Sequence, residues 1–210
     1  MEAYDHKLAQ DALRQTLRQS MLDAAARILQ QDGIAGLTVR KVAEAVNVST
    51  TLLYSCFGGK DGLADALYQQ GFHLFYDAYL ALGEQQAAVA PGLDRLRWYA
   101  MHYRRFAHEQ SAYYQIMFGD AMPRFTPGEE ASQLAWNSFT PLVTEFVAAM
   151  SLGQIPQGSA STAARQLWAA MHGVVSLELK GFYLRDTDAT KLYEGAVEAV
   201  LHYLQTSQEA

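Results

Sequence analysis

Apolar residues recur at helical spacing along most of the chain, and the clearest pattern lies near the N-terminal end. A first run places apolar side chains at positions i, i+3, i+4 and i+7, which makes one face of a helix: Leu22, Ala25, Ala26 and Leu29. A second run repeats this spacing: Val39, Val42, Ala43 and Val46. In a third segment Leu53 and Phe57 lie four residues apart. The pattern predicts three helices, each with one apolar face.

Residues with turn and cap chemistry separate these runs. Gly33 follows the first run and suits a left-handed C-terminal cap. Thr38 and Ser49 precede the second and third runs, where a hydroxyl can accept from the free amides of a first helical turn. Asn47 tolerates the positive φ that a sharp turn requires. The sequence therefore predicts short helices over residues 39–46 and 50–57.

Two short helices joined by a tight turn form a helix-turn-helix, which places its second helix in the DNA major groove. Hydroxyls on the side of residues 50–57 opposite Leu53 and Phe57 can reach base edges or phosphates, and Lys60 can neutralise another phosphate. A helical hairpin that only supports a core has the same spacing and stays open as an alternative. The candidate DNA-binding residues are Thr38, Arg40, Lys41, Ser49, Thr50, Thr51, Leu52, Tyr54 and Lys60.

The rest of the chain also has helical spacing and no strand pattern, so the predicted fold class is all-α. We expect helices over residues 60–82, from residue 93 onward, and over 111–119, 129–150, 163–183 and 187–205, with loops at 86–92, 122–128 and 154–161. Pro141 either kinks its helix or restarts it. The domains expected are a three-helix DNA-binding domain at residues 1–65 and a larger helical regulatory and dimerisation domain at residues 66–210.

The N-terminal segment has two interpretations. Residues 5–31 contain no Gly or Pro and form either one long helix or an arm followed by a shorter helix. Residues 1–17 are accordingly a helix extension or an arm. Lys7, Arg14 and Arg18 either touch DNA or belong to a solvated helix.

The helix that starts at Leu93 is apolar on two sides, which is typical of a central helix. Aromatic residues are dense on this helix and on those that start near Glu129 and Ala163. Ligand sites are apolar clefts with a few polar groups, so we predict a pocket for a small apolar or aromatic effector between these helices, unless the rings only form core. The candidate ligand-binding residues are Trp98, His102, Phe106, Phe118, Trp136, Phe139, Trp168 and His172, with the two histidines as polar anchors.

The last two helices predict self-association. Residues 163–183 carry two apolar stripes, one of which can face the core and the other a partner subunit, and Gly173 and Gly181 allow a close approach. Two such helices per subunit would form a four-helix interface about a two-fold axis. In the alternative, both helices pack only within one subunit. The candidate interface residues are Leu167, Ala170, Gly173, Val174, Leu177, Gly181, Val197 and Val200.

Composition changes this picture only slightly. The 210 residues have a net charge of −6 and a pI near 5.5, which excludes a generally basic nucleic-acid coat but not a small DNA footprint. Cys56 is the only cysteine, so no intrachain disulfide forms, as suits a reducing cytoplasm. The polar N-terminus is no signal peptide, and no apolar run is long enough to span a bilayer. We expect a cytoplasmic protein with no membrane partner.

Two rival classes remain. An enzyme would need a catalytic motif, but the chain has no Gly-x-Ser-x-Gly elbow, Gly-rich phosphate loop or histidine pair at i, i+4, and we expect no catalytic residue, metal or cofactor. A helical adaptor that binds only protein would show no binding to duplex DNA. A mobility-shift assay separates these classes.

The helix-turn-helix segment resembles the DNA-binding domain of the tetracycline-repressor (TetR) family of bacterial transcriptional regulators. The resemblance rests on Ala25, Gly33, Thr38, Val39, Val42, Ala43, Val48, Ser49, Leu53, Tyr54, Phe57, Lys60 and Leu63. Residues 167–179, LWAAMHGVVSLEL, and residues 97–118 resemble the Trp-His-Gly subfamily of C-terminal domains. The chain departs from the family at Thr51, Leu52 and Cys56.

The resemblance implies a homodimer that binds a palindromic operator through residues 50–57. It also implies a repressor that a small-molecule effector releases from DNA.

Overall fold

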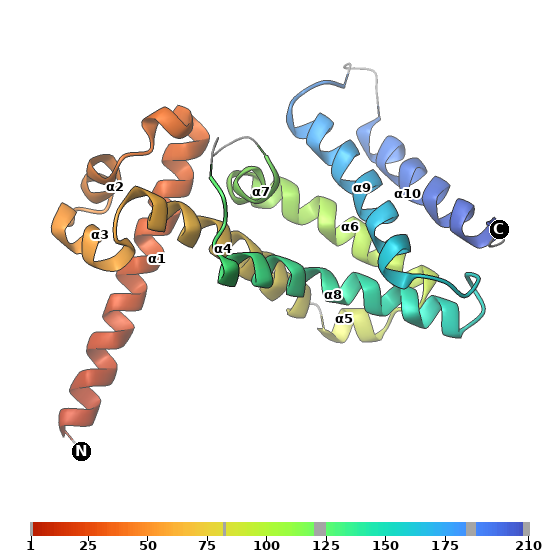
Figure 1. Cartoon of the computed structure of the whole chain (residues 1–210), viewed down its shortest axis with the longest axis horizontal. Coiled ribbons are helices and arrows are strands. Elements are labelled where there is room, and N and C mark those ends of the chain that lie inside the picture. The colour runs from red at the N-terminus through yellow and green to blue at the C-terminus, as the bar shows by residue number, and fades with distance from the viewer. Residues whose placement is uncertain (1, 82, 120–124, 184–187, 208–210) are drawn as a thin grey trace. The chain divides into compact units, whose positions relative to one another are not determined.

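The structure, a computed structural model, describes residues 2–81, 83–119, 125–183 and 188–207. Within these ranges the regular secondary structure is helical and no strand is present (Figure 1). The prediction of an all-α fold is confirmed. The helices are α1 (Glu2–Gly36), α2 (Val39–Ala45), α3 (Thr50–Phe57), α4 (Lys60–Leu80), α5 (Gly83–Ala87), α6 (Leu93–Glu109), α7 (Ser111–Phe118), α8 (Glu129–Ser151), α9 (Ala160–Leu179) and α10 (Ala189–Thr206).

The chain folds into two compact units, and their boundaries cut through helices. The first unit contains Met1–Leu74 and Ala112–Ala135, and the second contains Phe75–Ser111 and Trp136–Ala210. Most of α7 therefore belongs to the first unit, and α4 contributes its last turns to the second unit. The functional boundary expected after residue 65 stays a prediction.

The core of the first unit lies among α1, α2, α3, α4 and α7. The apolar residues that spacing alone selected are buried there, from Leu22 on α1 to Leu53 and Phe57 on α3. α7 adds Tyr113 and Ile116 to this core. The Tyr113 hydroxyl donates to a carboxylate oxygen of Asp23 at 3.1 Å, so the phenol keeps a hydrogen-bond partner when its ring is buried.

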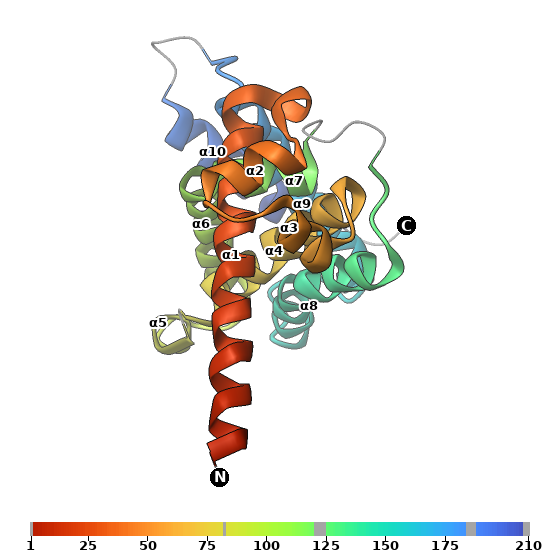
Figure 2. The ribbon, with the colours of Figure 1, turned by 90° about the vertical axis from the view of Figure 1, so that its left-hand side faces the viewer.

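α1 is one long helix, which was the first of the two alternatives for the N-terminal segment. Its N-terminal part extends beyond α2 and α3 as a single rod, and the side chains of residues 9–16 are exposed (Figure 2). Gly33 has the expected positive φ of 65° and a non-helical ψ of −172°, so the regular helix breaks there, as predicted, before a short helical segment that ends at Gly36. Arg18 lies 5.1 Å from the Phe57 ring, whereas the side chain of Lys7 lies outside those described. DNA contact by this extension stays a prediction.

α6 is the central helix of the second unit and packs against α9 and α10. Its buried residues come from the predicted stripes, and Tyr99 joins them: Leu96, Tyr99, Ala100, Tyr103, Phe106 and Ala107. The fully buried Tyr193 of α10 donates its hydroxyl to the Ala100 carbonyl at 2.6 Å. α6 is therefore fixed to α10 by a polar contact within an apolar core.

The ends of several helices differ from the sequence prediction. α8 runs through Pro141 without restarting. α9 begins earlier than predicted, because Ser159 caps it, and ends at Leu179, because Gly181 adopts a left-handed φ of 71°. Phe182 therefore lies beyond α9 and is 68% exposed, not on a buried stripe.

Residues 83–87 form α5, so the first two residues of the loop predicted at 86–92 are helical instead. The predicted loop at 122–128 and the helix start at residue 187 lie partly outside the described residues. None of the helices in the described ranges is long and apolar enough to cross a membrane.

Ion pairs join the helices of the second unit at their rims. The Arg104 guanidinium donates to both carboxylate oxygens of Glu178, at 2.6 and 2.9 Å, and to the Thr190 hydroxyl at 3.1 Å. This partly buried pair connects α6 with α9 and α10. On the opposite end of α6, Arg95 lies 3.4 Å from the buried Glu145 of α8. α6 is thus held by polar links at both ends.

The Arg104–Glu178 pair predicts a pH-dependent stability. Hydrogen bonding from Arg104 lowers the pKa of Glu178, so the stabilisation is present above the ordinary glutamate pKa of about 4.5 and is lost as pH falls through the lowered value. We expect Glu178→Gln to destabilise the protein by about 1.5–3 kcal/mol at pH 7, and by progressively less below pH 4.5. Thermal unfolding across this pH range measures it, with the exposed Asp77→Asn as control. A gap that stays constant with pH would contradict the assignment.

Candidate DNA-binding surface and ligand pocket

The two helices of the predicted helix-turn-helix are fixed by their caps. The Thr38 hydroxyl accepts from the Lys41 amide and the Ser49 hydroxyl accepts from the Leu52 amide, both at 3.2 Å. Asn47 has the positive φ expected of it, 54°, and the Val48 amide donates to the Ala43 carbonyl at 2.9 Å. The turn between α2 and α3 is therefore held by backbone and side-chain hydrogen bonds, and the sequence-based cap assignments are confirmed.

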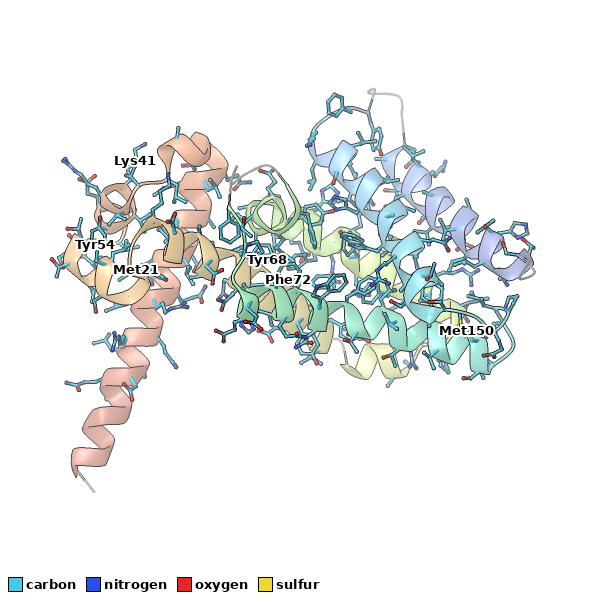
Figure 3. All side chains as sticks on the ribbon, in the orientation of Figure 1. Met21, Lys41, Tyr54, Tyr68, Phe72 and Met150 are labelled. Atoms are coloured by element: carbon cyan, nitrogen blue, oxygen red, sulfur yellow. The ribbon has the colours of Figure 1, made fainter. Side chains whose placement is uncertain are left out.

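α3 is buried on one side and exposed on the other. Leu53 and Phe57 pack into the core of the first unit. Thr50 and Thr51 are exposed, and Tyr54 is 56% exposed, while Leu52 and Cys56 are half-buried. Figure 3 labels Tyr54 on α3 and Lys41 on α2, both at the surface of this unit. The hydroxyls of Thr38 and Ser49 are also exposed and keep their protons free to donate while their oxygens accept.

The cations of this surface differ in how they are partnered. Arg40 pairs with Glu44 at 2.7 Å and Lys41 with Asp32 at 2.9 Å, and all four side chains are largely exposed. Exposed pairs of this kind contribute about 0–1 kcal/mol, so a phosphate can replace the carboxylate. Lys60, at the start of α4, is exposed and has no ion-pair partner among the described residues. The contact of Asp32, which reaches Lys41 from the preceding helix, was not predicted from the sequence.

The eight candidate ligand-binding residues fall into separate groups. Trp98, His102 and Phe106 lie on α6, where the Trp98 and His102 rings are 3.8 Å apart. On the α9 side, Trp168 stacks on His172 at 5.5 Å and meets Phe139 of α8 at 6.3 Å.

The other two candidates stand apart from these groups. Trp136 is 59% exposed, with Arg165 over its ring at 5.5 Å. Phe118 belongs to the first unit, where it packs on Phe72 and Tyr114.

His172 has hydrogen-bond partners on both sides of its ring. Its Nδ1 lies 3.4 Å from the Tyr103 hydroxyl and its Nε2 lies 3.2 Å from the Ser176 hydroxyl. Burial is the first cause that lowers the pKa of His172, and the Lys180 charge adds to it. This neutral, bonded imidazole is the arrangement of a satisfied core histidine. A ligand would have to displace Tyr103 or Ser176 to use it.

A hollow of about 40 Å³ lies between the end of α4 and α6, within the second unit. We call it the aromatic hollow. The rings of Phe75, Tyr79, Tyr99, Tyr103 and Phe106 form most of its walls, and its remaining lining residues are Ala78, His102, Arg105 and Glu109. The sequence prediction placed a pocket between α6, α8 and α9 and overlooked α4, although Phe72, Phe75, Tyr76 and Tyr79 repeat at helical spacing there.

The electrostatics of this hollow centre on His102. Its Nδ1 lies 2.7 Å from the Trp98 carbonyl, which fixes the proton on Nδ1 and leaves Nε2 as an acceptor in the neutral ring. Burial lowers the pKa of His102, the hydrogen bond to Trp98 opposes this, and the Arg105 charge lowers the pKa further. His102 is therefore neutral at pH 7.

The helix-turn-helix geometry agrees with comparisons to known proteins. Residues 21–67, which contain α2 and α3, match the family described as bacterial regulatory proteins of the tetR family. Residues 96–200 match the tetracyclin repressor-like C-terminal domain. The chain belongs to the TetR family. It is a DNA-binding transcriptional regulator, and the TetR family consists of regulators rather than enzymes.

Individual relatives share part of the sequence or the fold. The HTH-type transcriptional regulator BetI of Burkholderia thailandensis is 32% identical over 78 residues, which cover 37% of this chain and only 38% of BetI. A protein of unknown function from Rhodococcus sp. RHA1 has 24% identity and a TM-score of 0.75, over 90% of this chain and 96% of its own. AibR, solved with isovaleryl coenzyme A and operator DNA, has 19% identity and a TM-score of 0.65, over 87% and 97%. These two likenesses show that the fold is shared.

The residues predicted for a dimer interface of this TetR-family chain divide by burial. Leu167 is 0% and Val197 4% exposed, so both belong to the core of the second unit and have almost no surface to offer a partner. Gly173, Leu177 and Gly181 are exposed. Ala170, Val174 and Val200 are partly buried.

The exposed side of α9 is made of residues that sequence reasoning named only in part, at helical spacing: Gln166, Ala169, Gly173 and Leu177. Exposed residues of α10 that repeat at helical spacing are Leu192, Gly195, Ala199 and Tyr203. We call these residues the α9–α10 face. The face is apolar or small apart from Gln166. Two of the candidate residues, Ala170 and Val174, therefore lie one residue, or about 100° of helical rotation, away from the exposed Ala169 and Gly173.

The cap of α3 is the most direct target for testing this geometry. Ser49→Ala removes the acceptor for the Leu52 amide and should cost about 1 kcal/mol of unfolding free energy. Ser55→Ala, on the exposed side of the same helix, should cost nothing measurable, because Ser55 is exposed and caps no helix. Urea unfolding of both variants makes the comparison. Equal effects of the two substitutions would mean that the cap does not hold α3.

Proposed function

We propose that this TetR-family regulator is a homodimeric repressor that binds a palindromic operator and leaves it when a small molecule binds its second unit. The observation that carries the proposal is the exposed side of α3. Thr50, Thr51 and Tyr54 stand outward from a helix whose other side is locked into the core. Such a helix can enter the major groove, where hydroxyls reach base edges and an apolar side chain such as Leu52 meets a thymine methyl.

The positive groups around α3 support phosphate binding at the groove edges. Lys60 has no competing carboxylate among the described residues, and the exposed pairs of Arg40 and Lys41 are weak enough to exchange. Thr38 and Ser49 have free hydroxyl protons next to their caps. Neutralising a few phosphates supplies binding that falls with salt and does not depend on sequence. Sequence preference would come from Thr50, Thr51, Leu52 and Tyr54.

The second subunit follows from the geometry of duplex DNA. Two recognition helices bind successive major grooves when they lie about 34–36 Å apart, and a two-fold dimer then requires a palindromic site. The α9–α10 face supports this dimer, since its small and apolar residues would be left in water in a monomer.

Effector release needs a ligand that prefers one of two dimer states, because a ligand with equal affinity for both shifts nothing. The aromatic hollow supports this role because α4, which begins at Lys60, also provides Phe75 and Tyr79 to its wall. AibR was solved with both a coenzyme A thioester and operator DNA. We propose that this chain also binds both a small molecule and DNA, the first in its second unit and the second through its first unit. Coupling of this kind is typically worth about 1–3 kcal/mol.

Selection of genomic DNA fragments by the purified protein, followed by sequencing, tests the function itself. We expect fragments with two inverted half-sites whose centres lie about 10–10.5 base pairs apart, or a multiple of this. Retention of no duplex would contradict the proposal and favour a helical adaptor that binds only protein.

Lys60 provides a quantitative test of DNA docking. Lys60→Ala should weaken binding to every selected fragment and reduce the slope of log affinity against log salt by about one. Lys191→Ala removes an exposed lysine of α10, in the second unit, and should leave the DNA affinity and the salt slope unchanged. Titrations at several salt concentrations measure both. An unchanged slope for Lys60→Ala would show that this lysine does not contact a phosphate.

Gly173 provides a test of the dimer. Nothing lies within 4 Å of the position a Cβ would take there, so arginine fits a single subunit. Across a close helix pair, however, Gly173→Arg would place a charge where it loses its hydration. We expect Gly173→Arg to be a folded monomer at micromolar concentration by light scattering, and Gly83→Arg on α5, also open around its Cβ, to remain a dimer. A dimeric Gly173→Arg would exclude this face.

A further inference from the structure

The aromatic hollow does not end at its ring walls. A second, larger hollow of about 460 Å³ lies along α6 and is lined by Met101, His102, Arg104, Arg105 and His108. We call it the basic hollow. The two hollows share His102 and Arg105. An apolar, ring-lined space therefore adjoins a space whose lining side chains include two arginines and two histidines and no carboxylate.

The charges around Arg105 are unevenly balanced. The guanidinium of Arg104 and the imidazole of His108 both engage Glu178, whose two carboxylate oxygens they share. Arg105, by contrast, is exposed and has no hydrogen bond or ion pair among the described residues. The one carboxylate in the lining of the aromatic hollow is Glu109, one turn further along α6, and it makes no ion pair with Arg105. Arg105 is thus a cation free to bind an incoming anion.

The ring walls can exchange their contacts for those of a ligand. Phe75 of α4 meets Tyr99, Tyr103 and Phe106 of α6 edge to face, with centroids 5.1–6.3 Å apart. A compact apolar group that enters between them replaces ring contacts by similar contacts, so the exchange costs little. The existing volume of about 40 Å³ is far below that of a ligand pocket, so Phe75 or Tyr79 must move as the ligand enters.

We propose that the second unit binds an organic acid: a compact apolar or aromatic body in the aromatic hollow and a carboxylate on Arg105. A guanidinium binds a carboxylate through two parallel N–H···O bonds, which a neutral amide or an amine cannot reproduce. His102 lines both hollows, but its Nε2 is an acceptor in the neutral ring, so the hydrogen bonds to the carboxylate come from Arg105. This assignment rests on the proposed function of the second unit as a ligand-binding unit and specifies its ligand class.

The experiment compares three probes that differ only in their head group: 3-phenylpropionate, 3-phenylpropionamide and 3-phenylpropylamine. Binding to the full chain without DNA is measured by calorimetry and thermal shift. We expect the carboxylate to bind at least ten-fold tighter than the amide and the amine to bind weakest. Inorganic phosphate serves as a fourth arm, since an anion site without the apolar hollow would bind phosphate as well as the acid.

Three variants separate the charges. Arg105→Gln should lower the affinity for 3-phenylpropionate to that for the amide, and Glu109→Gln should leave it unchanged or raise it. Arg14→Gln, on the exposed part of α1, should leave all affinities unchanged. A preference for the amine that is lost in Glu109→Gln would overturn the proposal in favour of a cationic ligand. Three other outcomes would also overturn the proposal: the acid binds Arg105→Gln as well as wild type, phosphate binds as well as the acid, or no probe binds.

Operator release is measured separately, so that the two proposals fail independently. If the acid binds through Arg105 but leaves the protein on its DNA fragments, the ligand assignment stands and release by this ligand is wrong. If other compounds release DNA while Arg105→Gln has no effect on them, effector release stands and the organic-acid assignment is wrong.

Discussion

The burial of two side chains, Leu53 and Phe57, is the interaction on which the proposed DNA-binding surface depends. α3 has only eight residues, and a helix of two turns does not persist in water without tertiary packing. Both side chains are buried among α1, α2, α4 and α7, so α3 exists because its inner side is held. Its outer side then has a fixed direction. The hydroxyls of Thr50 and Thr51 and the phenol of Tyr54 on that side are exposed, so they are available for base edges and phosphates.

The second unit likewise contains polar side chains that are hydrogen-bonded within the protein and one that is not. Arg104 donates to both carboxylate oxygens of Glu178, and the Tyr193 hydroxyl donates to a backbone carbonyl within the core. His172 is likewise bonded at both ring nitrogens. Beside these paired groups Arg105 stands out, because its guanidinium has five N–H donors and no protein acceptor among the described residues. In the second unit, the group available to a ligand is therefore the guanidinium that forms no contact within the protein.

The features that the sequence predicted correctly are those that depend on residues close together in the chain. The caps at Thr38 and Ser49, the positive φ of Asn47 and the inward side of α3 all follow from residues within one or two turns of each other. The Lys41–Asp32 pair was not predictable in this way, because it joins separate helices. On α9, apolar residues on two sides left open which side is buried, and Leu167 proved to be core while Gly173 is exposed. The pocket predicted between α6, α8 and α9 stays a prediction, and the hollow beside α4 was not predicted because the spacing of Phe75 and Tyr79 was not considered.

The placement of α7 has a consequence for the order in which the protein is made. Tyr113 and Ile116 complete the core of the first unit, yet a ribosome adds them after the whole of α4, α5 and α6. The helix-turn-helix therefore cannot reach its final packing while the nascent chain ends near residue 65. Until Tyr113 is added, the Asp23 carboxylate lacks the hydrogen bond that the Tyr113 hydroxyl donates. Contacts between such distant segments also slow folding, since a long loop must close before they form. In this chain the proposed DNA-binding surface reaches its final packing only when part of the second unit has already been synthesised.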